Sequence, residues 1–135
     1  MKYYLQAITV NFVTLAGRAR RKEFWSFTLI STAIYLGFFF LDLHLGWMLV
    51  RESPYPEIPA MQLGKLSTLY LLLVFLPSLA ISVRRLHDTG RTGWCVLLNL
   101  VPCIGWMILF IMFCQDSQPW DNPYGTNPKR RCRYY

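Results

Sequence analysis

The sequence predicts an all-α integral membrane protein with three transmembrane helices and an interfacial helix near the N-terminus. Of its 135 residues, 54% are hydrophobic and only 16% are charged, whereas soluble domains have about 25% charged residues. Most apolar residues lie in three long runs, and a helix of about 20 such residues crosses the hydrocarbon core of a bilayer. Basic residues flank these runs, as is typical of membrane proteins. The length allows one domain, so residues 1–135 are expected to form a single membrane domain.

The N-terminal residues 1–23 are predicted to stay in the cytoplasm or at the membrane interface. Residues 3–16 are apolar but mixed and too few to cross the bilayer, so an amphipathic helix on the membrane surface is expected. The alternative is a flexible terminus. The first transmembrane helix is predicted over residues 24–43. Asp42 is expected at the far interface, and residues 43–50 lie along that interface or extend a tilted helix.

A loop separates the first two predicted helices. It covers residues 51–65, because the three prolines within residues 54–59 are incompatible with a regular helix. The second transmembrane helix is predicted over residues 66–83, which contain no charge. Pro77 lies inside this stretch and removes a backbone hydrogen bond, so a kink is expected there.

The third apolar run, residues 94–114, is interrupted by Pro102 and Gly105. We expect a single kinked transmembrane helix, because a re-entrant hairpin would need protein around its exposed backbone. The re-entrant hairpin is the alternative reading. An ordered but irregular polar tail is predicted over residues 115–135.

Positive charges collect on the cytoplasmic side of a membrane, which orients the predicted helices. The segment before the first helix and the turn after the second are both basic, and two crossings place them on one side. We therefore expect a cytoplasmic N-terminus. A single crossing by the third run would export the basic end of the tail, whereas a hairpin would return it. This basic end consists of Lys129, Arg130, Arg131 and Arg133.

Two arginine-rich motifs are the strongest local signals. They cover residues 17–25 and 84–94, and each ends in a tryptophan at the start of an apolar run. Arginines beside a membrane attract anionic headgroups, so an orientation signal with lipid contact is one interpretation. The other is a defined pocket for a phosphate-bearing ligand, because the guanidinium fork suits phosphate. The candidate residues for an anionic ligand or headgroup are Arg18, Arg20, Arg21, Arg84, Arg85 and Arg91.

Three other polar residues belong to these motifs. His87 and Asp88 are the nearest approach to a catalytic pair, in which His87 relays a proton. The structural interpretation is favoured, because no nucleophile accompanies the pair: Asp88 then caps a helix or closes the turn after it. Glu23 is expected to pair internally with one of the arginines and so tie the first span to the turn after the second.

At these motifs the chain resembles the bacterial membrane family called domain of unknown function 805. The matching patterns are Gly-Arg-x-x-Arg-x-Glu-Phe-Trp, Arg-Arg-Leu-His-Asp-Thr-Gly-Arg-Thr-Gly-Trp and, in the tail, Asn-x-Tyr-Gly. The resemblance extends over about residues 3–128. It implies a multi-pass protein of the bacterial inner (plasma) membrane and carries no assigned activity.

The leading functional hypothesis is a non-enzymatic membrane protein whose arginine-rich cytoplasmic rim binds anionic lipid or a partner protein. The alternatives are a subunit of an oligomeric transporter or channel, and an enzyme that acts on lipid through His87 and Asp88. The expected partners are membrane lipids, a second copy of the chain or another membrane protein. No nucleic acid is expected, because the basic residues flank apolar runs. No cofactor or metal is expected, since the four cysteines form no C-x2-C pair.

Overall fold

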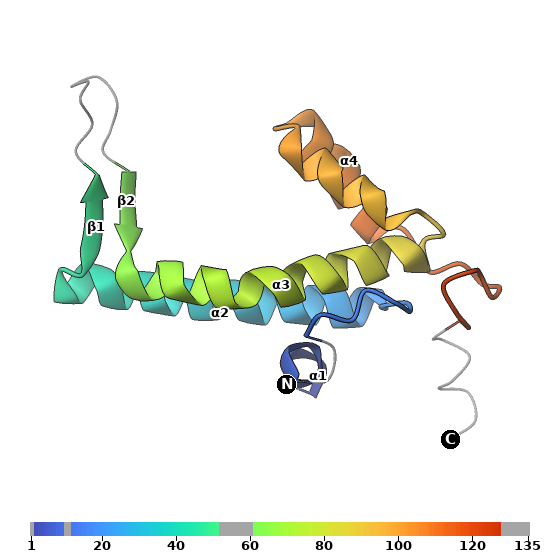
Figure 1. Ribbon diagram of the computed structural model, residues 1–135, viewed down its shortest axis with the longest axis horizontal. Coiled ribbons are helices and arrows are strands. Elements are labelled where there is room, and N and C mark those ends of the chain that lie inside the picture. Colours follow the sequence, from blue (N-terminus) through green and yellow to red (C-terminus); the bar gives the residue numbers. More distant parts are fainter. Residues whose placement is uncertain (1, 10–11, 52–60, 128–135) are drawn as a thin grey trace. The chain divides into compact units, whose positions relative to one another are not determined.

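The computed structural model of the chain describes residues 2–9, 12–51 and 61–127, which are mostly helical (Figure 1). One compact unit consists of residues 29–75, and the other combines the described residues up to Thr28 with those from Leu76 onward. In chain order the elements are α1 (Lys2–Thr9), α2 (Arg21–Leu45), β1 (Met48–Arg51), β2 (Met61–Gly64), α3 (Lys65–Asp88), the 3-10 helix η1 (Gly93–Leu100) and α4 (Ile104–Cys114).

Two helices of the described chain are long and apolar enough to cross a membrane. They are α2 with 25 residues and α3 with 24 residues, and α4 is a shorter apolar helix of 11 residues. Only 11% of the apolar stretch of α2 and 28% of that of α3 are buried. A helix at the core of a soluble protein is apolar all round because it is buried, and neither helix meets that condition. The predicted helical class is thus confirmed, with two long apolar helices and a shorter one.

In the unit of residues 29–75, the carboxylate of Asp42 caps the start of α3. Asp42 is fully buried, and its oxygens accept hydrogen bonds from the backbone N–H groups of Leu66 (3.1 Å) and Ser67 (2.9 Å). The hydroxyl of Ser67 donates a further bond to it at 3.0 Å. The first N–H groups of a helix have no partner within the helix, so Asp42 supplies one from α2. Gly64 allows this approach, because a Cβ there would lie 2.0 Å from Oδ2 of Asp42.

A short antiparallel hairpin, β1 and β2, lies between α2 and α3 (Figure 1). Met48 is opposite Gly64, and Leu49 is opposite Leu63. Residues 43–50 were expected to lie along the interface or to extend the helix; the helix extends only to Leu45, and a strand follows from Met48. The physical reason is local, since Gly46 takes a positive φ of 66°, which ends a helix at little steric expense. The proline-rich residues 53–59 fall outside the described residues.

The third apolar run forms a hairpin of two short helices and not the single kinked helix that was expected. The arms η1 and α4 pack against each other, and the indole N–H of Trp106 donates to the carbonyl of Asn99 at 3.1 Å. Gly105 lets the arms meet, because a Cβ there would lie 1.9 Å from the carbonyl oxygen of Leu98. The chain reversal agrees with the hairpin of the alternative, whereas its re-entry into the membrane stays a prediction.

The turn of this hairpin is tight and strained. Cys103 has φ 62° and ψ −71°, and the N–H of Ile104 donates to the carbonyl of Pro102 at 2.8 Å. This is the geometry of the rarer, strained γ-turn. Three residues thus suffice to reverse the chain between η1 and α4.

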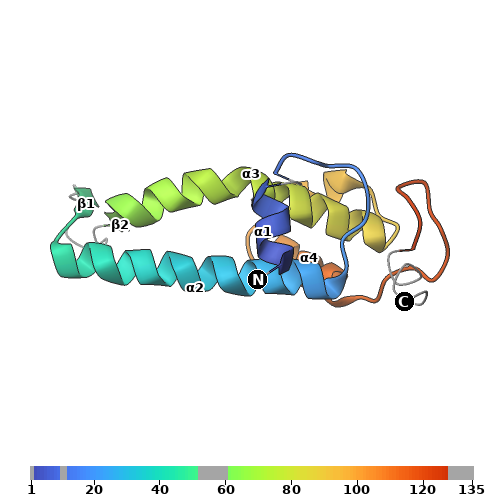
Figure 2. The same cartoon turned by 90° about the horizontal axis from the view of Figure 1, so that it is seen from below.

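In the unit that contains the termini of the described chain, α1, the start of α2, the end of α3 and α4 lie together. Figure 2 shows the segment between α1 and α2 running beside the C-terminal turns of α3. The ring of Tyr4 on α1 stacks on Phe27 of α2, with centroids 5.6 Å apart, and Phe24 contacts Phe113 of α4 with centroids 4.4 Å apart. The helix expected over residues 3–16 is present only as α1, which ends at Thr9.

Candidate functional site

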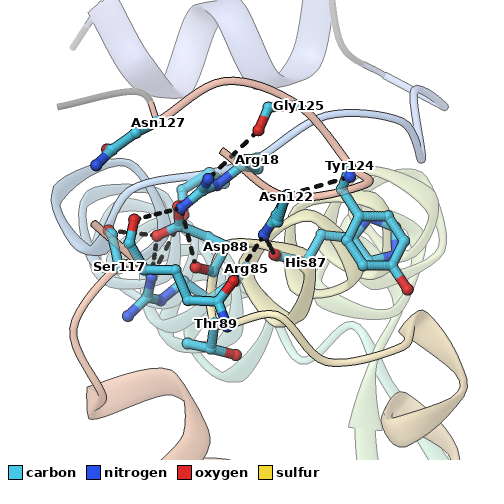
Figure 3. Close-up of polar contacts among 12 residues, drawn as sticks. Arg18, Arg85, His87, Asp88, Thr89, Ser117, Asn122, Tyr124, Gly125 and Asn127 are labelled. Atoms are coloured by element: carbon cyan, nitrogen blue, oxygen red, sulfur yellow. Dashed lines mark hydrogen bonds and ion pairs between the residues drawn. The ribbon is translucent and has the colours of Figure 1, made fainter. Parts of the chain in front are cut away.

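Asp88, the last residue of α3, is the centre of a buried polar cluster (Figure 3). It is fully buried, and its Oδ1 accepts a hydrogen bond from Nε of Arg18 at 3.0 Å. Its Oδ2 accepts bonds from Nη1 of Arg85 at 2.6 Å and from the hydroxyl of Ser117 at 2.5 Å. We call these four residues the Asp88 cluster. They come from the segment before α2, from α3 and from the tail, so one carboxylate joins three parts of the chain.

Arg18 uses all five of its N–H groups inside the protein. Besides the bond to the Asp88 carboxylate, Nη1 donates to the carbonyls of Trp120 (2.9 Å) and Gly125 (3.3 Å). Nη2 donates to the carbonyls of Asp88 (3.3 Å) and Gln118 (2.9 Å). A guanidinium has five donors, and the Arg18 side chain is only 1% exposed. No donor remains for a ligand.

Arg85 is satisfied in the same way. Its Nε and Nη2 donate to the carbonyl of Phe113 at 3.2 and 3.1 Å, and Nη2 also donates to the carbonyl of Gln115. Its Nη1 donates to Asp88 and, at 3.5 Å, to the carbonyl of Ala19. The side chain is fully buried. This guanidinium therefore fixes the end of α4 to the end of α3.

The three sequence motifs lie together. The N–H of Ala19 in the first motif donates to the carbonyl of Arg84 in the second at 3.0 Å. From the tail, the amide of Asn122 donates to the carbonyl of His87 at 2.8 Å, and the ring of Tyr124 stacks on the His87 imidazole. The two rings are 3.8 Å apart and inclined by only 2°. Segments some 35 to 100 residues apart along the chain thus form one site.

His87 and Asp88 are neighbours in sequence, but their side chains have different partners in the fold. His87 is 9% exposed, faces Tyr124, and burial lowers the pKa of its imidazole. The Asp88 carboxylate instead binds two guanidiniums and a hydroxyl. These contacts join parts of the chain and are structural. Asp88 was expected to cap a helix or close the local turn, but its carboxylate also binds residues from two other parts of the chain.

The remaining motif residues are nearer the surface. Nη2 of Arg21 pairs with Asp116 at 2.7 Å, with the Arg21 side chain 44% exposed, and Arg91 donates to the side chain of Gln115 at 3.2 Å. Arg20 is half-buried. Burial raises the pKa of the Glu23 carboxyl, against the attraction of Arg20 and Arg84.

Asp88 makes a further link between the segments that Glu23 was expected to join. Its ion pair with Arg18 links the segment before α2 to the end of α3, whereas Glu23 attracts Arg84 electrostatically. Arg84 itself is 7% exposed and lines a cavity of about 230 Å³.

The sequence did not predict that backbone carbonyls of the tail accept hydrogen bonds from Arg18. The carbonyls of Gln118 and Trp120 bind Arg18, and backbone carbonyls have no signature in the residue types. The one available signal was Asn122-Pro123-Tyr124-Gly125, which the sequence pointed to as a motif element without assigning its contacts.

Comparison with known proteins identifies the family. Residues 12–126 match the family described as "Protein of unknown function (DUF805)". The chain belongs to the DUF805 family. The matched range of this DUF805 protein includes both arginine motifs and the Asn-x-Tyr-Gly element, which meet around the Asp88 cluster. No solved structure matches the chain.

Two relatives of the chain are known in Escherichia coli (strain K12). The inner membrane protein YhaI is 44% identical over 129 residues, which cover 96% of this chain and 97% of YhaI. The inner membrane protein YhaH is 41% identical, with coverage of 96% and 98%. The names of these DUF805 relatives and the two long apolar helices together confirm the predicted class, an inner-membrane protein of a family without an assigned function.

Proposed function

We propose that this DUF805 protein is a non-enzymatic, multi-pass inner-membrane protein that binds anionic phospholipid headgroups at its cytoplasmic face. The observation that carries the proposal is the bond between Ala19 N–H and the Arg84 carbonyl, because it joins the two arginine motifs. Arg21 and Lys22, which are exposed, and Arg91, which is half-buried, form what we call the basic rim. Each basic residue near an anionic membrane surface contributes about 1 kcal/mol to binding.

The lengths of the hairpin arms support two crossings, by α2 and α3, with a re-entrant third run. The 11 residues of α4 rise about 16 Å at 1.5 Å per residue. The eight residues of η1 also rise about 16 Å, at about 2.0 Å per residue. Each arm therefore reaches about half of a hydrocarbon core of ~30 Å.

Both ends of the third run lie at the same end of α3. At its start, a Cβ on Gly93 would lie 2.8 Å from the side chain of Val83. At its end, Arg85 binds the carbonyl of Phe113. The tail then lies on the same side as the arginine motifs. This topology also places every strongly basic part of the sequence on the cytoplasmic side, as the distribution of charge in membrane proteins favours.

A topology reporter tests the re-entrant arrangement. Alkaline phosphatase fused after Tyr135 is expected to be inactive and green fluorescent protein to fluoresce there, since both report a cytoplasmic end. As the matched control, phosphatase inserted within residues 52–60 is expected to be active. An active phosphatase at Tyr135 would show that the third run crosses the membrane.

Lipid selectivity tests the basic rim. The full chain in detergent is titrated with phosphatidylglycerol and phosphatidylcholine, and bound lipid is counted by native mass spectrometry. Replacing Arg21, Lys22 and Arg91 with glutamine is expected to reduce the preference for phosphatidylglycerol at least about tenfold, because three headgroup attractions are lost.

The matched control is Lys65→Gln, which removes a positive charge at the opposite end of α3. It should leave the lipid preference unchanged. An unaltered preference in the triple variant would refute lipid binding by the rim. The alternative function, a subunit of an oligomeric transporter or channel, stays a prediction from the sequence.

A further inference from the structure

Arg84 differs from the two arginines of the Asp88 cluster. It is 7% exposed, and its Nε is buried with no hydrogen-bond partner among the described residues. Arg18 and Arg85, by contrast, use all five donors. Glu23 attracts Arg84, and burial lowers the pKa of its guanidinium. A buried donor of a charged group that lacks a hydrogen bond is unfavourable, so the retention of this N–H points to a ligand that accepts from it.

The side chain lines a cavity of about 230 Å³ made by all three motif-bearing segments. Ala16 and Gly17 line it from before α2, and Tyr124 and Gly125 line it from the tail. Gly17 and Gly125 have φ values of 94° and 138°, which side-chain-bearing residues rarely adopt. The backbone of the cavity wall is thus shaped by glycine at two places. The volume lies below the roughly 300–1,000 Å³ of drug-sized pockets, which suits a single phosphate group.

The surroundings of the cavity favour an anion. In the adjoining Asp88 cluster, two guanidiniums face one carboxylate, so the cluster carries excess positive charge. Glu23 opposes this at Arg84 but makes no ion pair with it among the described residues. The ring of Tyr124 is held in place by its stack on His87. Charge and shape of the wall are therefore set before any ligand arrives.

We propose that this cavity binds a phosphate group, with the guanidinium of Arg84 donating to its oxygens. The proposal rests on the proposed function and adds to it an internal anion site, separate from the basic rim. Guanidinium binds phosphate through paired, charge-assisted hydrogen bonds. A phospholipid headgroup and a small soluble phosphate ester offer the same group, and the experiment distinguishes them.

The test titrates the full chain in detergent with two kinds of probe. One arm uses inorganic phosphate and glycerol 3-phosphate, followed by calorimetry against sodium chloride of equal ionic strength. The other arm uses vesicles of phosphatidylcholine with and without phosphatidic acid, with the protein reconstituted. The variants are Arg84→Gln, which removes the donor, and Ala16→Leu, which fills the cavity and keeps the charge. The control is Lys65→Gln, and circular dichroism checks that each variant is folded.

Saturable binding of either probe is expected in the wild type and in Lys65→Gln. Arg84→Gln should weaken it at least about tenfold, the effect of losing a charge-assisted hydrogen bond, and Ala16→Leu should weaken it because a larger side chain stands in the cavity wall. Binding in the soluble arm identifies a small ester, and binding in the vesicle arm alone identifies a headgroup. Absence of binding in both arms, or wild-type binding by both variants, would overturn the proposal.

Phosphate binding in the Arg84 cavity and lipid binding at the basic rim can be tested independently of each other. The triple glutamine variant of the rim is expected to keep phosphate binding in the cavity. Arg84→Gln is expected to keep the preference for phosphatidylglycerol at the rim. Loss of one effect alone in each variant distinguishes a failed cavity site from a failed lipid-binding rim.

Discussion

Asp88→Asn is expected to lower the free energy of unfolding by about 3–5 kcal/mol, the range for breaking a buried ion pair from one side. The substitution keeps the size of the side chain and removes its charge. Arg18 and Arg85, whose side chains are at most 1% exposed, then lose their shared counter-charge. Unfolding of the purified protein in detergent, followed by circular dichroism, measures the change.

The matched control is Asp116→Asn. Asp116 also pairs with an arginine, Arg21, but its side chain is 56% exposed, and an exposed ion pair contributes at most about 1 kcal/mol. The two substitutions are chemically identical, so the burial of Asp88 and its larger number of partners separate their expected effects. Equal losses of stability in the two variants would show that Asp88 does not hold the cluster together.

Gly105→Ala is expected to destabilise the hairpin of η1 and α4 by about 1–3 kcal/mol or more, as overpacking of a tight contact does. The added Cβ would lie 1.9 Å from the backbone carbonyl of Leu98, and a backbone atom within a helix cannot simply turn away. The arms must separate, which also weakens the bond of Trp106 to Asn99. Chemical unfolding in detergent and the tryptophan emission of the folded state measure both effects.

Gly37→Ala provides the comparison for this prediction. Gly37 lies inside α2, and a Cβ there meets nothing within 4 Å. Alanine is the better helix former by about 1 kcal/mol, so this variant should be as stable as the wild type or more so. If Gly105→Ala is as stable as Gly37→Ala, then η1 and α4 do not approach each other closely at Gly105.

The long helices were predictable because composition alone decides them. The stretches after Phe24 and Leu66 are too apolar for water and long enough for lipid, whatever their neighbours. The third run was different, because Pro102 and Gly105 are compatible with either a kink or a reversal. The contact that separates the two, between Gly105 and the Leu98 carbonyl, is a matter of backbone approach. No pattern of residue types reports such a contact.

The candidate site was predictable in its members but not in their roles. From the sequence, the two motifs were expected on the same side of the membrane, and their arginines were predicted to be one set of anion-binding residues. The use of all five donors by Arg18 and Arg85, and the unpartnered Nε of Arg84, depend on which backbone carbonyls lie nearby, such as that of Gln118 for Arg18. Every residue type has a backbone carbonyl, so the sequence could not predict which guanidinium donors find an acceptor. Asp88 was assigned a local turn because its partners Arg18 and Ser117 are distant in sequence.

The reach of Arg18 along the chain has a consequence for biosynthesis. Its acceptors at Gln118, Trp120 and Gly125 are 100, 102 and 107 residues further on. While the ribosome is still making those residues, three N–H groups of Arg18 lack the carbonyls that they bind in the folded chain. When the tail emerges, the same group is withdrawn from solvent and closes the structure. The burial of Arg18 is thus complete only after the last part of the described chain has been made.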